Sequence, residues 1–271
     1  MDVKMLSSLP PWEWPADAGQ LLLSALETDT REDPDRLLAV ELAGSTTVMN
    51  DDLAQALLAI VRDPGETETI RGRAAISLGP TLEELDTNGF DDPEELLVSE
   101  GVAQAIRDGL REVYLDAGVP KDVRRRALEA SVRAEEGWHP AAVRAAYDSG
   151  DDEWKLTAVF CMCYVAGFDR EIVEALESND PAVRYHAVRA AGNWAVEAAW
   201  PRIRALVSAE KIDKPLLLAA IEAVAGIRPR EAGEILAHLT DAEDDEIADA
   251  VSEALAIAGP ADQFDDLDDR T

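Results

Sequence analysis

The sequence predicts an all-α protein, a right-handed α-α superhelix in which about seven antiparallel helix pairs are stacked. The prediction starts from residues 179–192, because altered copies of this stretch recur along nearly the whole chain. In it, Asp180 can accept hydrogen bonds from the free amides of a first helical turn, and Pro181 suits the first helical position. Val183 and Ala187 begin an apolar stripe with the spacing of one helix face. The stretch therefore predicts one complete, capped helix.

Aligned copies of this helix form a repeat. Counting Val183 as position zero, the anchor position holds Ile70, Val123, Trp154, Val183, Leu216 and Ile247. Alanine stands at position 4, as Ala39, Ala74, Ala127, Ala158, Ala187 and Ala220. From Val123 onward the anchors are 31, 29, 33 and 31 residues apart. A nearly constant period of this length is typical of stacked helical repeats.

A second, weaker helical pattern precedes each copy, so the expected unit is a pair of helices, A and B. The pairs are expected at 16–44, 51–62 with 67–79, 102–115 with 120–134, 141–148 with 151–165, 170–176 with 180–194, 197–208 with 213–226, and 231–239 with 244–257. They form one solenoid over 16–258, interrupted by an insertion at 80–100. Prolines and tryptophans in 1–15 predict an extended capping segment, and 259–271 is an acidic tail.

The most regular repeat residues are Ile70-Arg71 with Ala74-Ala75 and Leu78-Gly79, Val123-Arg124 with Ala127-Leu128 and Ala130, and Val183-Arg184 with Ala187 and Gly192. In these residues the chain resembles the HEAT-repeat family, specifically its short bacterial, phycobilisome-lyase-like branch. The resemblance covers roughly residues 16–258 and implies that the B helices line a concave face. It is specific for fold and nearly silent on function.

Composition excludes several classes of partner. The formal net charge of −31 disfavours general binding to nucleic acid or to anionic membranes. Cys161 and Cys163 are the only cysteines, and their spacing on a helix favours two buried thiols over a metal or redox pair. No stretch has the length and apolarity of a signal peptide or membrane span. We therefore expect a cytoplasmic protein without a membrane partner, and the oligomeric state stays open.

Candidate binding residues lie on the B helices. Leu156, Phe160 and Tyr164 follow one another at four-residue spacing on a helix that is apolar nearly all round, and the next two B helices carry Tyr185 and Leu218 at the position of Leu156. The full candidate groove, with its flanking arginines, is Arg125, Arg126, Leu156, Phe160, Tyr164, Tyr185, Arg189 and Leu218. Such aromatic and arginine-rich strips are typical of interaction hot spots. An alternative interpretation is that tight curvature buries these side chains between repeats.

Three other arginines have a structural interpretation. Arg71, Arg124 and Arg184 each stand one residue after an anchor. Arginines at this position are expected to hydrogen-bond the turns of the next repeat.

The insertion contains a calcium-loop candidate. Residues 84–95 place oxygen-bearing side chains at loop positions 1, 3, 5, 9 and 12, namely Glu84, Asp86, Asn88, Asp92 and Glu95. Glutamate at position 1 and Asp91 at position 8 depart from the usual loop. A solvated acidic linker gives the same coincidence and is the favoured interpretation, so we assign no metal or cofactor.

The sequence offers no catalytic motif. His139, His186 and His238 stand in separate repeats, and none precedes the glutamate found in the His-Glu pairs of deoxyhypusine hydroxylase, an iron enzyme on this fold. The leading hypothesis is a non-catalytic scaffold that binds a protein or peptide segment in its concave groove. One alternative is a phycobilin-lyase-like chromophore chaperone. A less favoured one is a HEAT-like alkylpurine DNA glycosylase that uses Trp154 and Trp194.

Overall fold

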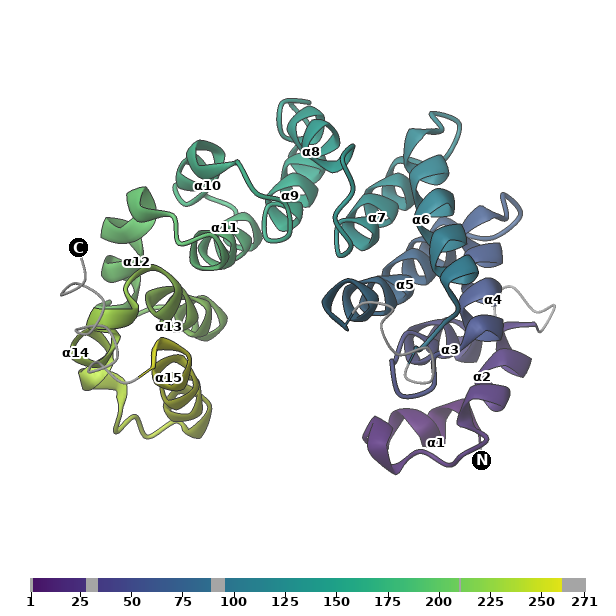
Figure 1. The fold of residues 1–271 in the computed structure, drawn as a ribbon, viewed down its shortest axis with the longest axis horizontal. Coiled ribbons are helices and arrows are strands. Elements are labelled where there is room, and N and C mark those ends of the chain that lie inside the picture. Colours follow the sequence, from purple (N-terminus) through teal and green to yellow (C-terminus); the bar gives the residue numbers. More distant parts are fainter. Residues whose placement is uncertain (1, 28–33, 89–95, 210, 260–271) are drawn as a thin grey trace, which may run out of the picture. The chain divides into compact units, whose positions relative to one another are not determined.

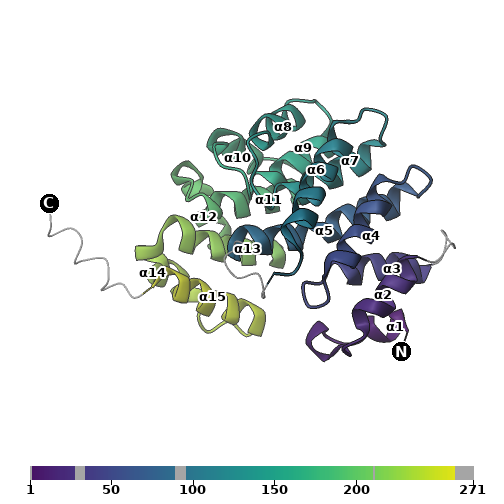
Figure 2. The ribbon, with the colours of Figure 1, turned by 45° about the vertical axis from the view of Figure 1, so that its right-hand side comes forward.

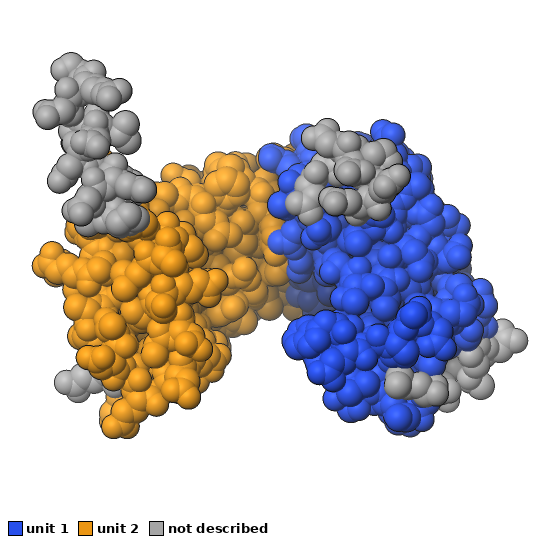
Figure 3. Space-filling view, turned by 60° about the horizontal axis from the view of Figure 1, so that its bottom comes forward, with its two compact units in different colours: residues 1–137 blue, residues 138–271 orange. Residues whose placement is uncertain are grey.

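The fold is described from a computed structural model of the chain, which describes residues 2–27, 34–88, 96–209 and 211–259. In these ranges every regular element is an α-helix or a 3-10 helix. The chain divides into two compact units, residues 1–137 and residues 138–271 (Figure 1 and Figure 3). Each unit is a stack of antiparallel helix pairs. The predicted all-α solenoid of seven pairs is confirmed.

Unit 1 contains three pairs and an N-terminal helix. The pairs are α2 (Ala18–Leu26) with α3 (Pro34–Ala43), α4 (Asp51–Arg62) with α5 (Glu68–Asn88), and α6 (Glu100–Leu115) with α7 (Lys121–Ser131). The A helices α2, α4 and α6 pack in one row, and the B helices α3, α5 and α7 pack in a second row. The core lies between the two rows, with Leu57, Leu78 and Ile106 fully buried in it.

Unit 2 contains four pairs. They are α8 (His139–Tyr147) with α9 (Asp152–Cys161), α10 (Asp169–Ala175) with α11 (Pro181–Asn193), α12 (Trp200–Val207) with α13 (Lys214–Ile227), and α14 (Ala232–Leu236) with α15 (Asp245–Ala258). Short 3-10 helices stand at Glu197–Ala199, Pro229–Glu231 and Ala237–Leu239. The B helices α9, α11, α13 and α15 pack in sequence, each on the next. Within the unit the A helices curve around this row, so the B row is the concave side (Figure 1 and Figure 2).

Aspartate caps of the kind predicted at Asp180 begin several B helices. The Asp151 carboxylate accepts hydrogen bonds from the amides of Glu153 and Trp154 at 3.0 and 3.1 Å. Asp180 and Asp244 likewise accept from amides two residues later, at 2.8 and 3.1 Å. These bonds satisfy amides that have no partner inside the helix. At α9, α11 and α15 the cap therefore fixes where the B helix starts.

A ladder of arginines joins A helices to B helices. The side chains of Arg36, Arg71 and Arg124 each donate from Nε to the carbonyl ten residues earlier, at 3.1, 2.9 and 2.8 Å. Arg184 donates to the Ser178 carbonyl at 2.7 Å. Because carbonyls at a helix end lack partners within the helix, these bonds satisfy otherwise free acceptors. The three arginines expected to have a structural role do form such bonds, but their acceptors, Val61, Tyr114 and Ser178, lie in the same helix pair and not in the next repeat as expected.

The N-terminal segment was expected to be extended, and that prediction was wrong because two short helices form in it. Residues Val3–Ser7 form helix α1, and Pro11–Glu13 form a 3-10 helix. The Asp2 carboxylate caps α1 by accepting from the Met5 amide at 2.9 Å, and Val3 and Leu6 are buried. The prediction gave weight to the prolines and overlooked this short cap and apolar pair. The helix packs against α2 and α3, beside the first pair.

The insertion begins later than predicted. Helix α5 does not end at Gly79 but continues through Pro80 to Asn88. Leu78, Leu82 and Leu85 are all buried, so the apolar stripe continues past the proline and keeps the chain helical.

This extension bears on the calcium-loop candidate. Glu84, Asp86 and Asn88 belong to helix α5 in the structure, whereas a calcium loop would begin at Glu84. The other two candidates, Asp92 and Glu95, lie outside the described residues, as does most of the acidic tail.

Candidate functional site

One face of unit 2 brings together most of the predicted groove residues. It consists of repeat positions 2, 6 and 10, which are four residues apart and share one side of each B helix. We call it the B face; its residues are Leu156, Phe160 and Tyr164 from α9 and the following turn, Tyr185, Arg189 and Asn193 from α11, Leu218, Glu222 and Gly226 from α13, and Asp249, Glu253 and Ile257 from α15. Its character changes from aromatic at α9 to acidic at α15.

The α9 end of the B face is an aromatic cluster. The rings of Phe160 and Tyr164 are 5.5 Å apart between centroids, although α9 ends at Cys161 and Tyr164 lies in the following turn. His186 meets Phe160 edge-on at 5.2 Å and lies 5.2 Å from Tyr185. Edge-to-face packing at these distances is favourable for aromatic rings. All four side chains are half-buried, so they pack on one another and still present surface to solvent.

A pocket of about 400 Å³ opens beside this cluster, between α11, α13 and α15. Arg189, Glu222 and Glu253 line it, and these three residues are position 6 of their helices. Position 10 contributes Asn193, Gly226 and Ile257, and the wall is completed by Gly192, Ala219 and Ala223. Equivalent positions of successive B helices therefore line one pocket.

Small residues bring α11 and α13 together under the pocket. A Cβ atom placed on Gly226 would stand 2.3 Å from the carbonyl oxygen of Gly192. A Cβ atom on Gly192 would stand 2.8 Å from the Cα atom of Ala223. Both distances are below any ordinary contact, so the two backbones approach each other as closely as they do only because both positions are glycine.

The charged groups of the pocket have no ion-pair partner among the described residues. Arg189 is half-buried, whereas Glu222 and Glu253 are exposed. Elsewhere on unit 2, comparable groups are paired: Lys214 contacts Asp244 at 2.7 Å, and Arg228 contacts Glu197 at 2.7 Å. The pocket thus combines one available guanidinium with two available carboxylates.

Two residues at the C-terminal end of α11 hydrogen-bond to the turn that follows α9. Asn193 donates from its side chain to the Cys163 carbonyl at 3.0 Å, and the Trp194 indole donates to the Met162 carbonyl at 2.7 Å. These bonds satisfy carbonyls that follow the end of α9. Trp194, suggested above for a glycosylase, therefore has a structural role here.

The two cysteines are buried, as expected. Burial raises the pKa of the Cys163 thiol to about 11, although nearby Arg189 acts in the opposite direction. The thiol therefore stays protonated at neutral pH, which makes it unreactive.

The imidazole of His186 carries a testable pH dependence. Burial, helped by the positive charge of Arg189, lowers the pKa of this imidazole to about 4 from an ordinary value of 6.5. Between those pH values the unfolded chain binds more protons, so stability falls as the pH decreases through that range. From pH 7 to pH 5, we expect the native protein to lose about 1–2 kcal/mol more unfolding free energy than His186→Asn. Urea denaturation at both pH values measures this difference; an equal loss in the two proteins would contradict it.

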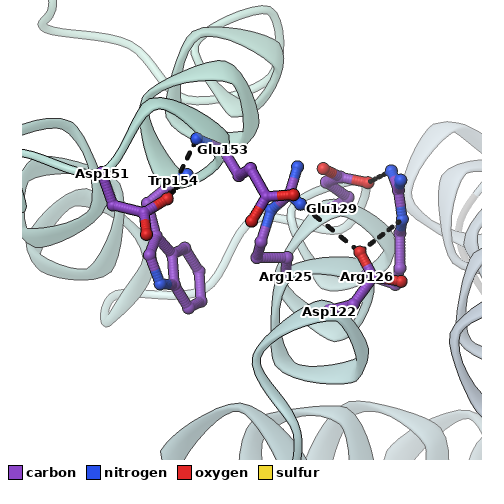
Figure 4. A network of polar contacts seen from close by, with 7 residues as sticks. All are labelled: Asp122, Arg125, Arg126, Glu129, Asp151, Glu153 and Trp154. Atoms are coloured by element: carbon purple, nitrogen blue, oxygen red, sulfur yellow. Dashed lines mark hydrogen bonds and ion pairs between the residues drawn. The ribbon is translucent and has the colours of Figure 1, made fainter. Parts of the chain in front are cut away.

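The remaining groove candidates, Arg125 and Arg126, lie on α7 in unit 1. Arg125 is buried, and its Nη1 atom lies 3.4 Å from a carboxylate oxygen of Asp122. Arg126 contacts Glu129 at 2.6 Å and Asp122 at 3.8 Å (Figure 4). Their charges are thus compensated by carboxylates of the same helix, unlike that of Arg189.

The groove prediction missed four side chains that line the pocket, Asn193, Glu222, Glu253 and Ile257. It compared position 2 across three B helices but followed positions 6 and 10 on α9 alone. Extending the register by four and eight residues on every B helix identifies all four.

The described ranges contain no group of three or more His, Cys, Asp or Glu side chains arranged to hold a metal ion. Within them, no helix has both the length and the apolarity that crossing a bilayer requires.

Seven stacked helix pairs define an α-helical repeat protein. The family model of HEAT repeats matches residues 170–268, which supports the predicted resemblance to HEAT repeats in that part of the chain. Proteins of this class generally serve as interaction scaffolds, because stacked repeats present extended concave surfaces.

Several solved structures are similar. They include YibA of Escherichia coli, at 15% identity and TM-score 0.46 over 91% of this chain and 84% of that chain. An archaeal HEAT-like repeats protein from Thermococcus onnurineus has 14% identity and TM-score 0.42, over 91% and 98%. Human deoxyhypusine hydroxylase has 15% identity and TM-score 0.41, over 92% and 86%. A comparison with curated protein sequences gave no match.

Proposed function

We propose that this chain is a non-catalytic interaction scaffold that binds a protein or peptide segment on the B face of unit 2. The observation that carries the proposal is the pocket lined by Arg189, Glu222 and Glu253, next to the half-exposed aromatic cluster. Available charges beside aromatic surface are the features that concentrate binding energy in protein interfaces. Arg125 and Arg126 are left out of the proposed site because neighbouring carboxylates compensate them.

The exposure of the face supports the same conclusion. Ile257 is 68% exposed at the rim of the pocket, and the four aromatic side chains keep part of their surface open. A partner that covers these groups removes apolar area from water and supplies counter-charges for the carboxylates and the guanidinium.

Peptide display on phage tests the proposal. A library of random twelve-residue peptides is selected on the full chain, and enriched peptides are labelled and titrated by fluorescence anisotropy. We expect Phe160→Asp and Arg189→Glu each to weaken binding by about tenfold or more, which corresponds to the loss of one hot-spot contact.

Two matched charge changes serve as controls. Glu234→Lys on α14 and Arg204→Glu on α12 alter exposed residues of the A helices and are expected to bind like the native protein. Thermal unfolding monitored by circular dichroism verifies that all four variants are folded. If the enriched peptides bind Phe160→Asp and Arg189→Glu as tightly as the controls, the B face is not the binding site.

A further inference from the structure

We infer that the partner segment is extended and carries, in order along the B face, an apolar side chain, a carboxylate, and one or two lysine or arginine side chains. The inference rests on the proposed function and gives the chemistry of its ligand. It is based on position 6 of the four B helices, which holds Phe160, Arg189, Glu222 and Glu253 in succession. The sequence of these four groups is aromatic, cationic, anionic and anionic.

This order in the chain is also an order in space. Helix α9 packs on α11, α11 packs on α13, and α13 packs on α15. Equivalent positions therefore form a row that crosses the helices, and Arg189, Glu222 and Glu253 meet in the same pocket. Position 2 repeats the trend with Leu156, Tyr185, Leu218 and Asp249, from apolar to acidic.

The distance between neighbouring B helices favours an extended segment in which about every third side chain faces the protein. Packed helices lie about 8–10 Å apart, and an extended chain of the polyproline II type advances about 3.1 Å per residue with three residues per turn, so every third side chain is on one side. A segment crossing the row therefore places about every third side chain over a new B helix. Four helices need a segment of about ten residues.

Charge complementarity fixes which side chains the segment carries. The Arg189 guanidinium matches a carboxylate, with which it can form two parallel hydrogen bonds. Glu222 and Glu253 match lysine or arginine. A purely basic segment would place a cation against Arg189, and a purely acidic one would face the two glutamates, so either is disfavoured by like-charge contact. The segment of mixed sign satisfies all three groups.

A variant in which the three pocket charges are reversed provides the test. The random twelve-residue library is selected on the native chain and on the triple variant Arg189→Glu, Glu222→Lys, Glu253→Lys. We expect the native chain to enrich peptides in which an apolar residue, an acidic residue and a basic residue follow at intervals of about three residues, in either chain direction. The triple variant is expected to enrich the order apolar, basic, acidic.

Synthetic peptides make the comparison quantitative. One peptide carries Trp, Glu, Lys and Lys at every third position, separated by Ser and Gly, and the other carries Trp, Lys, Glu and Glu; each is also made in reverse sequence. We expect the native chain to prefer the first by about tenfold and the triple variant to prefer the second, with the preference weakened by salt. The A-helix pair Glu234→Lys and Arg204→Glu should leave the native preference unchanged.

The outcomes separate this inference from the proposed function. Suppose that Phe160→Asp no longer binds the enriched peptides, but these peptides show no order of charge or show the same order with the native chain and the triple variant. That result overturns the inference and leaves the B face as the binding site. Enriched peptides that bind Phe160→Asp and Arg189→Glu normally overturn both.

Discussion

Replacement of Arg36 by methionine is expected to lower the free energy of unfolding by about 3–5 kcal/mol. The Arg36 Nη2 atom lies 2.6 Å from the Oε1 atom of Glu66, and the two side chains are only 8% and 5% exposed. The Nε atom of the same guanidinium donates to the Leu26 carbonyl. Methionine fills much of the volume but leaves the Glu66 carboxylate buried without its counter-charge, which is the costly part of the change.

Urea denaturation followed by circular dichroism measures this loss. Arg62→Met is the matched control, because Arg62 contacts Glu112 at 2.8 Å in a pair whose side chains are 43% and 70% exposed. We expect less than about 1 kcal/mol for this exposed pair. Adding Glu66→Met to Arg36→Met should recover part of the stability. Equal losses of unfolding free energy in Arg36→Met and Arg62→Met would show that burial of the ion pair does not determine the cost of breaking it.

Gly226→Ala is expected to destabilise unit 2 by about 1–3 kcal/mol or more, in spite of the higher helix propensity of alanine. The added Cβ atom would stand 2.3 Å from the Gly192 carbonyl oxygen, which is backbone and cannot rotate away. Helices α11 and α13 must then separate, and the pocket between them must change shape. Peptides selected on the native chain should bind this variant more weakly even where it is fully folded.

Gly233→Ala is the control for the same chemical change. Gly233 lies in α14, and a Cβ atom placed there meets nothing within 4 Å. Its stability should be unchanged or higher by up to about 1 kcal/mol, the usual gain when alanine replaces glycine in a helix. Unfolding curves of the two variants that coincide would contradict the close approach of α11 and α13.

The repeat could be predicted from the sequence because caps, anchors and alanines recur in fixed columns. Asp151, Asp180 and Asp244 cap their helices where the pattern placed them, and Arg71 and Arg124 bond the carbonyls of the preceding helices. Each of these signals is local in the chain or separated by a few residues, which is what a single sequence reveals best.

The structure differs from the prediction in two places where buried apolar side chains keep the chain helical. The helix expected to end at residue 79 continues through Pro80, because Leu82 and Leu85 bury the same apolar stripe beyond it. The prolines of the N-terminal segment hid the capped turn at Asp2. In both places the burial of apolar side chains decides the conformation, and burial depends on neighbouring helices that the sequence does not position.

Part of the candidate site could be predicted from the sequence, and the rest depends on how the helices are placed. Phe160, Tyr185 and Arg189 follow from residue type and helix face. The availability of a charge depends instead on its neighbours in space: Arg126 is paired with Glu129, whereas Arg189 has no such partner among the described residues. The close approach at Gly192 and Gly226, which forms the pocket floor, likewise appears only once the helices are placed.

The most direct test of the B face as a binding site is site-specific photo-crosslinking with a peptide selected on the native chain. The photoreactive residue p-benzoylphenylalanine is placed at Leu218, at the centre of the B face, and separately at Arg204 on the A helix α12. The B-face proposal predicts a covalent peptide adduct at position 218 that excess unlabelled peptide abolishes, and no such adduct at position 204. Crosslinking at position 204 with none at position 218 would contradict it.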